Sequence, residues 1–306
     1  MANIDHQVRV AAFNWLTDQV RIHGDVLPRD LLARGFEFEG QRVPLVGPQG
    51  IFKPRILPQV PLSITTTPKG PYDDSFGSDG FLLYRYRGAD PQHRDNAGLR
   101  KAFFNKTPLI YFHGIVPGKY LAAWPVYIVA DQPERLTFKV ALEDPAYIQT
   151  GLQRRDGVLP LSDTGEKARR AYLTGSVRHR LHQSGFRERV LNAYREQCAF
   201  CRLRHRDLLE AAHIIPDGEP EGKPVVSNGI SLCKLHHAAF DKYFLGLRPD
   251  CVIEVRRDIL EEEDGPMLLH GLQGLHMTKM YVPRPGRSRP NPDFLDWRYQ
   301  RFRKAI

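Results

Sequence analysis

The sequence contains few cysteines and has no long apolar run. Four cysteines occur among 306 residues, and no apolar stretch approaches the roughly 20 residues that a membrane helix needs. The first residues show no basic segment followed by an apolar one, so we expect no signal peptide and a cytoplasmic location. In a reducing compartment, closely spaced cysteines are better read as metal ligands than as disulfides. These absences argue against a disulfide-rich secreted domain and against a membrane protein.

Acidic residues are in deficit. Lys and Arg number 44 against 35 for Asp and Glu, which gives a formal charge of +9. The excess is concentrated between residues 151 and 206 and between residues 278 and 306, with an acidic run at 261–264 between them. This balance favours a polyanionic partner, with nucleic acid the first candidate, although a merely solvated basic face is the plainer alternative.

Length and composition predict two folded domains. Hydrophobic residues make up 42% and charged residues 26% of the chain, the mixture of an ordinary globular protein. The chain is long enough for two domains of common size. Strand signals stop and Arg-rich helical signals begin near residue 155. We therefore predict a first domain at 1–155, a helical linker at 156–186 and a second domain at 187–306.

The first domain combines helix and strand patterns. A helical pattern ending at Gly24, a short helix at 27–32 and a hairpin at 36–43 follow the order of a winged helix. Short strands are predicted at 81–86, 109–113, 126–129 and 136–140, with a helix at 96–103. The fold class is thus α+β, with a mixed α/β barrel-like domain first. Further helices are predicted at 166–174, 187–197 and 293–304.

Two pairs of metal-ligand residues stand in the second domain. Cys198 and Cys201 are separated by two residues, and so are Cys233 and His236. Each pair can form a tight knuckle that presents both side chains to one ion, and three thiolates with one imidazole suit Zn2+. A site filled by four protein ligands is structural. The alternative is that these cysteines are ordinary buried residues of the core. We interpret Cys251 in that way.

Three further elements occur around these ligands. They are Ala212-His213-Ile214-Ile215-Pro216, Ser227-Asn228-Gly229-Ile230, and Leu232-Cys233 through His236-His237 to Phe240-Asp241. In these residues the sequence resembles the HNH nuclease family, over about residues 187–255. The resemblance implies a ββα-metal finger threaded by the zinc knuckle, in which two strands carry the first His and the Asn and a helix carries the last His.

The resemblance implies a role for each site residue. His213 is the expected general base, because a His of ordinary pKa can take a proton from water near neutral pH. His237 is expected to bind a catalytic Mg2+ or Mn2+, with Asp241 one helical turn on as a second ligand or as a group that orients His237. Asn228 is expected to hold His213 in position. Many family members carry a ligand where this chain has Ala212, so the second ligand stays open between Asp241 and Asn228.

The first domain is expected to choose the target, since an HNH finger contacts mainly phosphates. Its aromatic and polar side chains could hold an extruded base, although each could equally be ordinary core. The candidates are Tyr84, Tyr86, Asn96, Tyr111, His113 and Trp124. Here the chain resembles, more loosely, modification-dependent restriction enzymes whose reader domains are SRA/PUA-like or sulfur-binding-like.

We therefore predict a metal-dependent DNA endonuclease that acts on double-stranded, modified DNA. Phosphates would be held by basic residues of the Arg-rich stretches, namely Arg169, Arg170, Arg178, Arg180, Arg298 and Arg301. Cleavage of both strands with one such site per chain favours a homodimer. Two alternatives remain, a mobile-element nuclease that reads plain sequence through the winged helix and a non-catalytic, zinc-stabilised DNA-binding protein.

Overall fold

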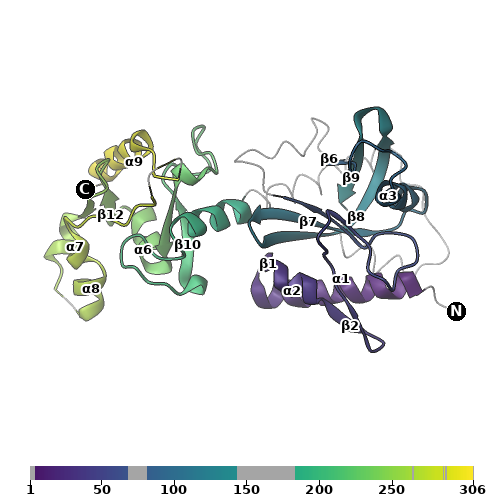
Figure 1. Ribbon diagram of the computed structural model, residues 1–306. Coiled ribbons are helices and arrows are strands. Elements are labelled where there is room, and N and C mark those ends of the chain that lie inside the picture. The colour runs from purple at the N-terminus through teal and green to yellow at the C-terminus, as the bar shows by residue number, and fades with distance from the viewer. Residues whose placement is uncertain are drawn as a thin grey trace, which may run out of the picture. The chain divides into compact units, whose positions relative to one another are not determined.

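The computed structural model describes residues 4–67, 81–142, 183–263, 265–284, 286 and 288–305. The chain divides into two compact units, residues 1–184 and 185–306 (Figure 1). The domain boundaries drawn from the sequence remain predictions, because most of the linker and the helix expected at 166–174 lie outside the described residues. Within the described ranges, no helix combines the length and apolar character needed to cross a membrane.

The first unit is built on a curled sheet of seven described strands. Their order is β4-β5-β7-β8-β9-β6, and β1 pairs with β8 as well. All neighbours are antiparallel except β5 and β7, which are parallel. The strands are β1 (Val26–Pro28), β4 (Ile51–Phe52), β5 (Ser63–Thr66), β6 (Leu82–Arg85), β7 (Leu109–Val116), β8 (Lys119–Gln132) and β9 (Thr137–Leu142).

The curl of this sheet comes from its two long strands. The register of β7 against β8 shifts between Leu109 and Tyr111, and that of β8 against β9 shifts between Ile128 and Ala130. Such irregularities bend a strand and increase its twist. Among the described strands, β4 and β6 end the sheet without pairing with each other. The predicted α+β class is confirmed, and the barrel-like sheet is an open half-barrel.

Helices cover both faces of the sheet. The helices that the structure describes in this unit are α1 (Ile4–His23), α2 (Arg29–Arg34) and α3 (Arg94–Phe104). Alternate residues of β7 point to opposite faces, so Ile110 and Phe112 join the core around α1, while Leu109 and Tyr111 join the core around α3. Strand β7 is therefore buried on both faces, which explains why its sequence is an almost unbroken apolar run.

The N-terminal elements agree with the winged-helix order only in part. The predicted first helix and the hairpin of β2 (Phe36–Phe38) and β3 (Gln41–Val43) are confirmed. The helix predicted at 27–32 is displaced, because Val26–Pro28 is extended and pairs with β8. Pro28 has φ −71° and ψ 143° and precedes the helix, which begins at Arg29. The segment is therefore an edge of the main sheet and not a separate winged helix.

The second unit packs short elements around one core. A helix spans residues 183–193, four positions earlier than predicted, and it ends before Arg195 and Glu196, which both have positive φ. The other elements are β10 (Leu209–His213), β11 (Gly229–Cys233), α6 (Lys234–Asp241), β12 (Leu245–Leu247), β13 (Ile253–Val255), α7 (Arg257–Glu261), α8 (Pro266–Gly271) and α9 (Pro292–Lys304). The predicted C-terminal helix is confirmed as α9, whose first turn is capped by the Asn291 side chain.

Candidate functional site

A hairpin followed at once by a helix forms the centre of the second unit. Strands β10 and β11 pair antiparallel, with His213 opposite Gly229 and Leu209 opposite Cys233. Cys233 is the residue before α6, so the strand passes directly into the helix. A Cβ at Gly229 would lie 2.3 Å from a methyl group of Val190. Glycine at this position therefore lets the helix at 183–193 pack closely on the hairpin beside His213.

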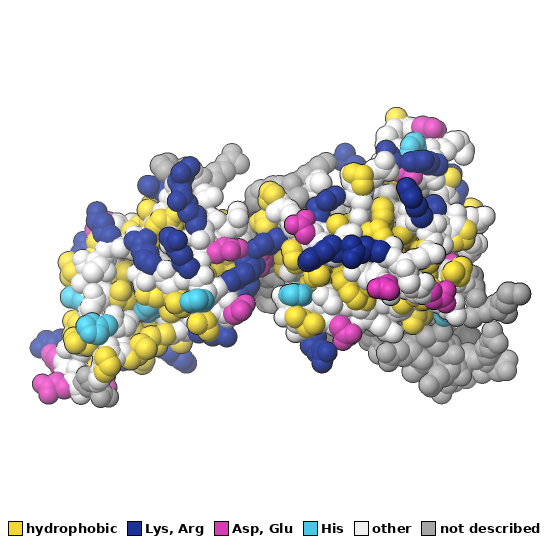
Figure 2. All heavy atoms as spheres, turned by 60° about the horizontal axis from the view of Figure 1, so that its bottom comes forward, with side chains coloured by type: hydrophobic (Ala, Val, Ile, Leu, Met, Phe, Trp, Pro, Cys, Tyr) yellow, Lys and Arg dark blue, Asp and Glu magenta, His cyan; other side chains and the backbone are white. Residues whose placement is uncertain are grey.

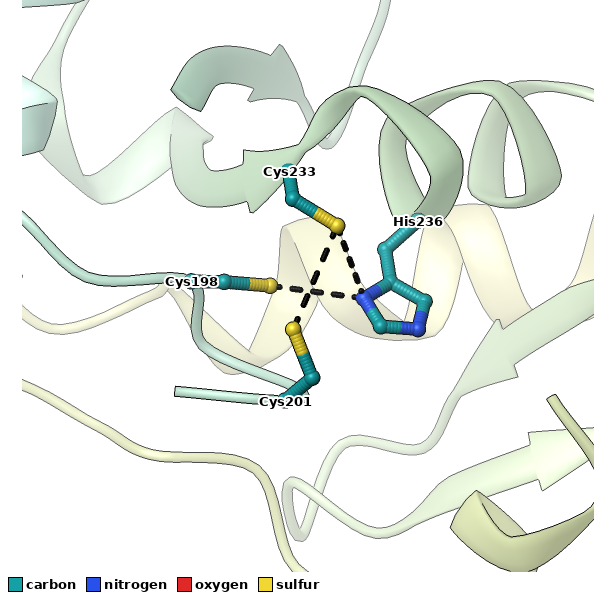
Figure 3. A group of neighbouring side chains, drawn as sticks. All are labelled: Cys198, Cys201, Cys233 and His236. Atoms are coloured by element: carbon teal, nitrogen blue, oxygen red, sulfur yellow. Dashed lines mark hydrogen bonds between the residues drawn. The ribbon is translucent and has the colours of Figure 1, made fainter. Parts of the chain in front are cut away.

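Three cysteines and one histidine converge at the N-terminal end of α6 (Figure 3). The ligand atoms of Cys198, Cys201, Cys233 and His236 all lie within 4.8 Å of one another. The Nδ1 atom of His236 lies 3.4 Å from the Cys198 sulfur and 3.2 Å from the Cys233 sulfur. Among the described residues this is the one cluster of three or more such groups. Its donors fit a tetrahedral zinc site with no open position.

The first knuckle of this cluster is built by the backbone. Arg202 has φ 67°, its N–H donates to the Cys198 carbonyl, and the Cys198 N–H donates to the Leu203 carbonyl. On the other side of the cluster, His236 Nε2 donates to the Gly271 carbonyl at 2.7 Å. That bond leaves Nδ1 as the nitrogen with a lone pair facing the sulfurs, as metal-bound histidines require. Cys251 lies apart from the cluster, half-buried against the unit's core.

His213 ends β10 and lies under an aromatic ring. Its imidazole stacks on Phe186 with ring centres 4.1 Å apart and an angle of 16° between the planes. Its Nε2 is buried and has no hydrogen-bond partner among the described residues. Burial lowers the pKa of His213, and the nearby charge of His237 adds to this, while Asp217 and Asp241 oppose it. The ring is therefore neutral near pH 7 and able to accept a proton.

Asn228 is fully buried and bonds only to backbone in the described residues. Its side-chain oxygen accepts from the Ile215 N–H at 2.9 Å, and its amide donates to the carbonyls of Ile215 and Lys223 at 3.0 Å each. Its own carbonyl accepts from the Ile214 N–H. Asn228 thus ties the two residues after His213 to the start of β11, and it reaches His213 through the backbone.

His237 is held between two carboxylates. Its Nδ1 lies 2.6 Å from Oε2 of Glu210, and its Nε2 lies 3.3 Å from Oδ2 of Asp241. The bond to Asp241 raises the pKa of His237 and that to Glu210 adds to it, against the effect of burial. Burial raises the pKa of Asp241, but the contacts with His237 and Arg298 outweigh it and the net shift is downward.

Glu210 is the site residue that sequence reasoning missed. It lies two positions before Ala212 on β10, and residues two apart on a strand share a face. Ala212 itself is fully buried and offers no ligand atom. The sequence did contain a signal for Glu210: it is an acidic residue on the same strand face as Ala212, the position where many family members carry a ligand.

The predicted phosphate contacts meet different outcomes. Arg298 is only 3% exposed and donates to the carbonyls of Phe240 and Ile214 and to Asp241. The prediction that it binds DNA is therefore wrong for this conformation, because its guanidinium is enclosed by α6 and α9. Arg301 lies over the Trp297 ring on α9. Arg169, Arg170, Arg178 and Arg180 lie outside the described residues. Figure 2 shows several Lys and Arg side chains on the surface of residues 185–306.

The predicted reader residues are mostly interior. Tyr84, Tyr86 and Tyr111 belong to the core under α3, and burial raises the pKa of Tyr84 and of Tyr86. Asn96 is fully buried and bonds to the backbone of Arg87 and Asp90. These four therefore cannot stack on a base in this conformation, which corrects the prediction. The other two predicted reader residues, Trp124 and His113, are half-buried. Trp124 packs at the edge of the core around α1, and Nδ1 of His113 lies 2.8 Å from the Tyr111 hydroxyl.

The second unit thus contains two strands followed by a helix, β10, β11 and α6, beside a group of three cysteines and one histidine that could hold a metal ion. Residues 198–248 match the family described as HNH endonuclease, which confirms the resemblance for this segment. The chain is also similar to a solved structure titled "Modification dependent TagI restriction endonuclease", at 16% identity and a TM-score of 0.30, covering 93% of this chain and 89% of that one.

A second similar structure is titled "Structure of the Type IV phosphorothioation-dependent restriction endonuclease ScoMcrA". It has 16% identity and a TM-score of 0.22, with 59% of this chain and 46% of that chain covered. No curated protein matches the chain.

Proposed function

We propose that this protein is a metal-dependent DNA endonuclease in which His213 is the general base. The observation that carries the proposal is the ββα arrangement itself, within the segment that matches HNH endonucleases. It sets a neutral, half-buried imidazole on β10, and the charges of His237 and Asp241 on α6 act on that imidazole. The basic composition of the chain supports a nucleic-acid substrate.

The proposed reaction is hydrolysis of one phosphodiester bond. His213 takes a proton from a water molecule, whose oxygen forms a bond to phosphorus while the bond from phosphorus to the leaving deoxyribose oxygen breaks. The released oxygen takes a proton from solvent. Because Nε2 of His213 is buried, Nδ1 is the nitrogen that receives the proton. A bound Mg2+ or Mn2+ would supply charge stabilisation at the phosphate and the leaving oxygen.

The remaining residues bind or orient in this scheme. His237 Nε2 and Asp241 Oδ2, which face each other at 3.3 Å, would hold the catalytic ion, and their nitrogen and oxygen donors suit it. Asn228 fixes the backbone that follows His213. The zinc cluster fixes the start of α6, and so the position of His237 one residue beyond His236.

The pH dependence of cleavage tests the role of His213. The base must be neutral to accept a proton, so activity is present above its pKa and is lost as the pH falls through it. Burial lowers the pKa of His213 from 6.5, so the acid limb of kcat/KM is expected below pH 6.5 when Mg2+ is saturating. An acid limb above pH 7 in the same measurement would contradict this assignment.

We also propose that the first unit reads modified DNA and directs the finger to it. The support is physical: contacts of a finger to phosphates carry little sequence information, and residues 1–184 form a unit with two cores of their own. Trp124 and His113 are the half-buried candidates for contact. A homodimer would supply the second site needed to cut both strands.

Digestion of matched plasmids tests this reading. Copies of one plasmid, unmodified or carrying methylated, hydroxymethylated or phosphorothioate groups, would be incubated with the protein and Mg2+ or Mn2+. We expect one modified copy to be cut roughly tenfold faster or more, equivalent to about 1.4 kcal/mol of discrimination. Equal cleavage of all copies at fixed sites would favour the sequence-reading alternative. Binding without cleavage under all conditions would favour the non-catalytic one.

A further inference from the structure

Glu210 is the acidic group nearest to His237 on the side away from Asp241. Its Oε2 lies 2.6 Å from Nδ1 of His237, and its side chain is 40% exposed. A carboxylate is an acceptor, so the proton of this hydrogen bond is on Nδ1. Glu210 therefore fixes which nitrogen of His237 carries a proton and how its ring is turned.

The opposite nitrogen of His237 faces a second acceptor. The Nε2 atom of His237 lies 3.3 Å from Oδ2 of Asp241, so a second ring proton on Nε2 can join them as an ion pair. A divalent cation that takes the place of this proton would meet one nitrogen and one oxygen donor. Asp241 is itself anchored, because Arg298 donates to its other oxygen, Oδ1, at 3.4 Å from a buried position. The Nε2 and Oδ2 atoms are thus a two-atom donor set held from both sides.

Glu210 does not itself join this donor set. Glu210, His237 and Asp241 do not form a cluster whose ligand atoms meet, since the described residues contain such a cluster only at the zinc knuckle. Glu210 contacts one edge of the imidazole and Asp241 the other. A carboxylate that receives the second N–H of a metal-bound histidine orients the ring and raises its basicity.

We infer that Glu210 is a positioning residue for the catalytic ion: by holding Nδ1–H of His237, it aims Nε2 at the ion shared with Asp241. The inference rests on the proposed function, because it names how that site holds its ion. It also accounts for Ala212. This chain has no ligand at Ala212, before the general base. On the same strand face, the carboxylate of Glu210 instead strengthens metal binding by His237.

Binding of Mn2+ to the zinc-loaded full chain, without DNA, tests this inference separately from cleavage. Calorimetry or Mn2+ electron paramagnetic resonance would compare the wild type with Glu210→Ala and Glu210→Gln. Loss of an orienting partner typically weakens metal binding 10–100-fold, so we expect a loss of that order for Glu210→Ala. Glu210→Gln keeps an acceptor oxygen and should recover most of the affinity. Glu219→Ala, on the exposed loop between the strands, is the matched control and should bind as the wild type does.

A second readout reports the ring directly. Nitrogen chemical shifts of neutral His237 in the zinc-loaded protein without Mg2+ or Mn2+ should show a single Nδ1–H tautomer in the wild type and a mixture in Glu210→Ala. Unchanged Mn2+ affinity in a folded Glu210→Ala variant would overturn the inference. So would equal losses in Glu210→Gln and Asp241→Asn, because Glu210 would then be a ligand. If the wild type cleaves no DNA but Glu210→Ala still loses Mn2+ affinity, the positioning role stands and the proposed function fails.

Discussion

Replacement of His213 by alanine is expected to lower the rate of DNA cleavage by about 100-fold or more, with zinc content and fold unchanged. The reason is that a positioned general base contributes roughly 10²–10⁴ in rate, and the described residues contain no other imidazole stacked at the end of β10. Single-turnover cleavage of a plasmid at saturating Mg2+ measures the effect, because it isolates the chemical step.

The matched control for this variant is His205→Ala. His205 is exposed and precedes the short turn before β10, so its loss should change cleavage less than about twofold, as for most surface substitutions. Circular dichroism would compare the fold of both variants with that of the wild type. We expect His213→Ala, which loses the stack on Phe186, to give the wild-type spectrum. If His213→Ala cut DNA at the wild-type rate, the assignment of the base would be wrong and the non-catalytic alternative would gain support.

Loss of the zinc cluster should have the second large effect. Structural zinc in small fingers contributes an apparent binding free energy of about 10–16 kcal/mol at pH 7, and here it would join the loop at Cys198 to the start of α6. We expect about one equivalent of zinc in the purified protein. Cys198→Ser should lose it, unfold locally over the finger and abolish cleavage. Metal analysis together with hydrogen exchange of residues 198–241 measures both changes.

Cys251→Ser is the control for the zinc prediction, because Cys251 is a half-buried thiol outside the cluster. This variant should retain its zinc and its protection from exchange. Retention of a full equivalent of zinc by Cys198→Ser, with unchanged protection over α6, would contradict the assignment of the four ligands.

The cluster of Cys198, Cys201, Cys233 and His236 could be predicted from the sequence because the spacing within each pair is local. Each pair is separated by two residues, so a single turn of backbone brings its two side chains together, whatever the rest of the fold does. The order of His213, Asn228 and His237 was equally informative, since a hairpin followed by a helix is specified by neighbouring segments. The structure adds the hydrogen bonds of the Asn228 side chain to the backbone of Ile215 and Lys223, which a linear pattern does not contain.

The contacts that sequence reasoning missed depend on packing between distant segments. Glu210 meets His237 only because α6 folds back along β10, 27 positions away. Arg298 becomes buried because α9 lies against α6, 57 residues from Asp241. Strand alternation around Tyr84 and Tyr86 could not reveal that both faces of this sheet are covered by helices.

Two neighbouring residues of α6 face two different groups of side chains. His236 contacts the cysteine sulfurs, and His237 lies between the carboxylates. Consecutive side chains on a helix point about 100° apart. A one-residue insertion or deletion between Cys233 and this pair would turn both side chains by about 100°, so neither histidine would keep its present contacts. Anyone transplanting this finger into another scaffold would have to move the hairpin and the helix as a single uninterrupted block.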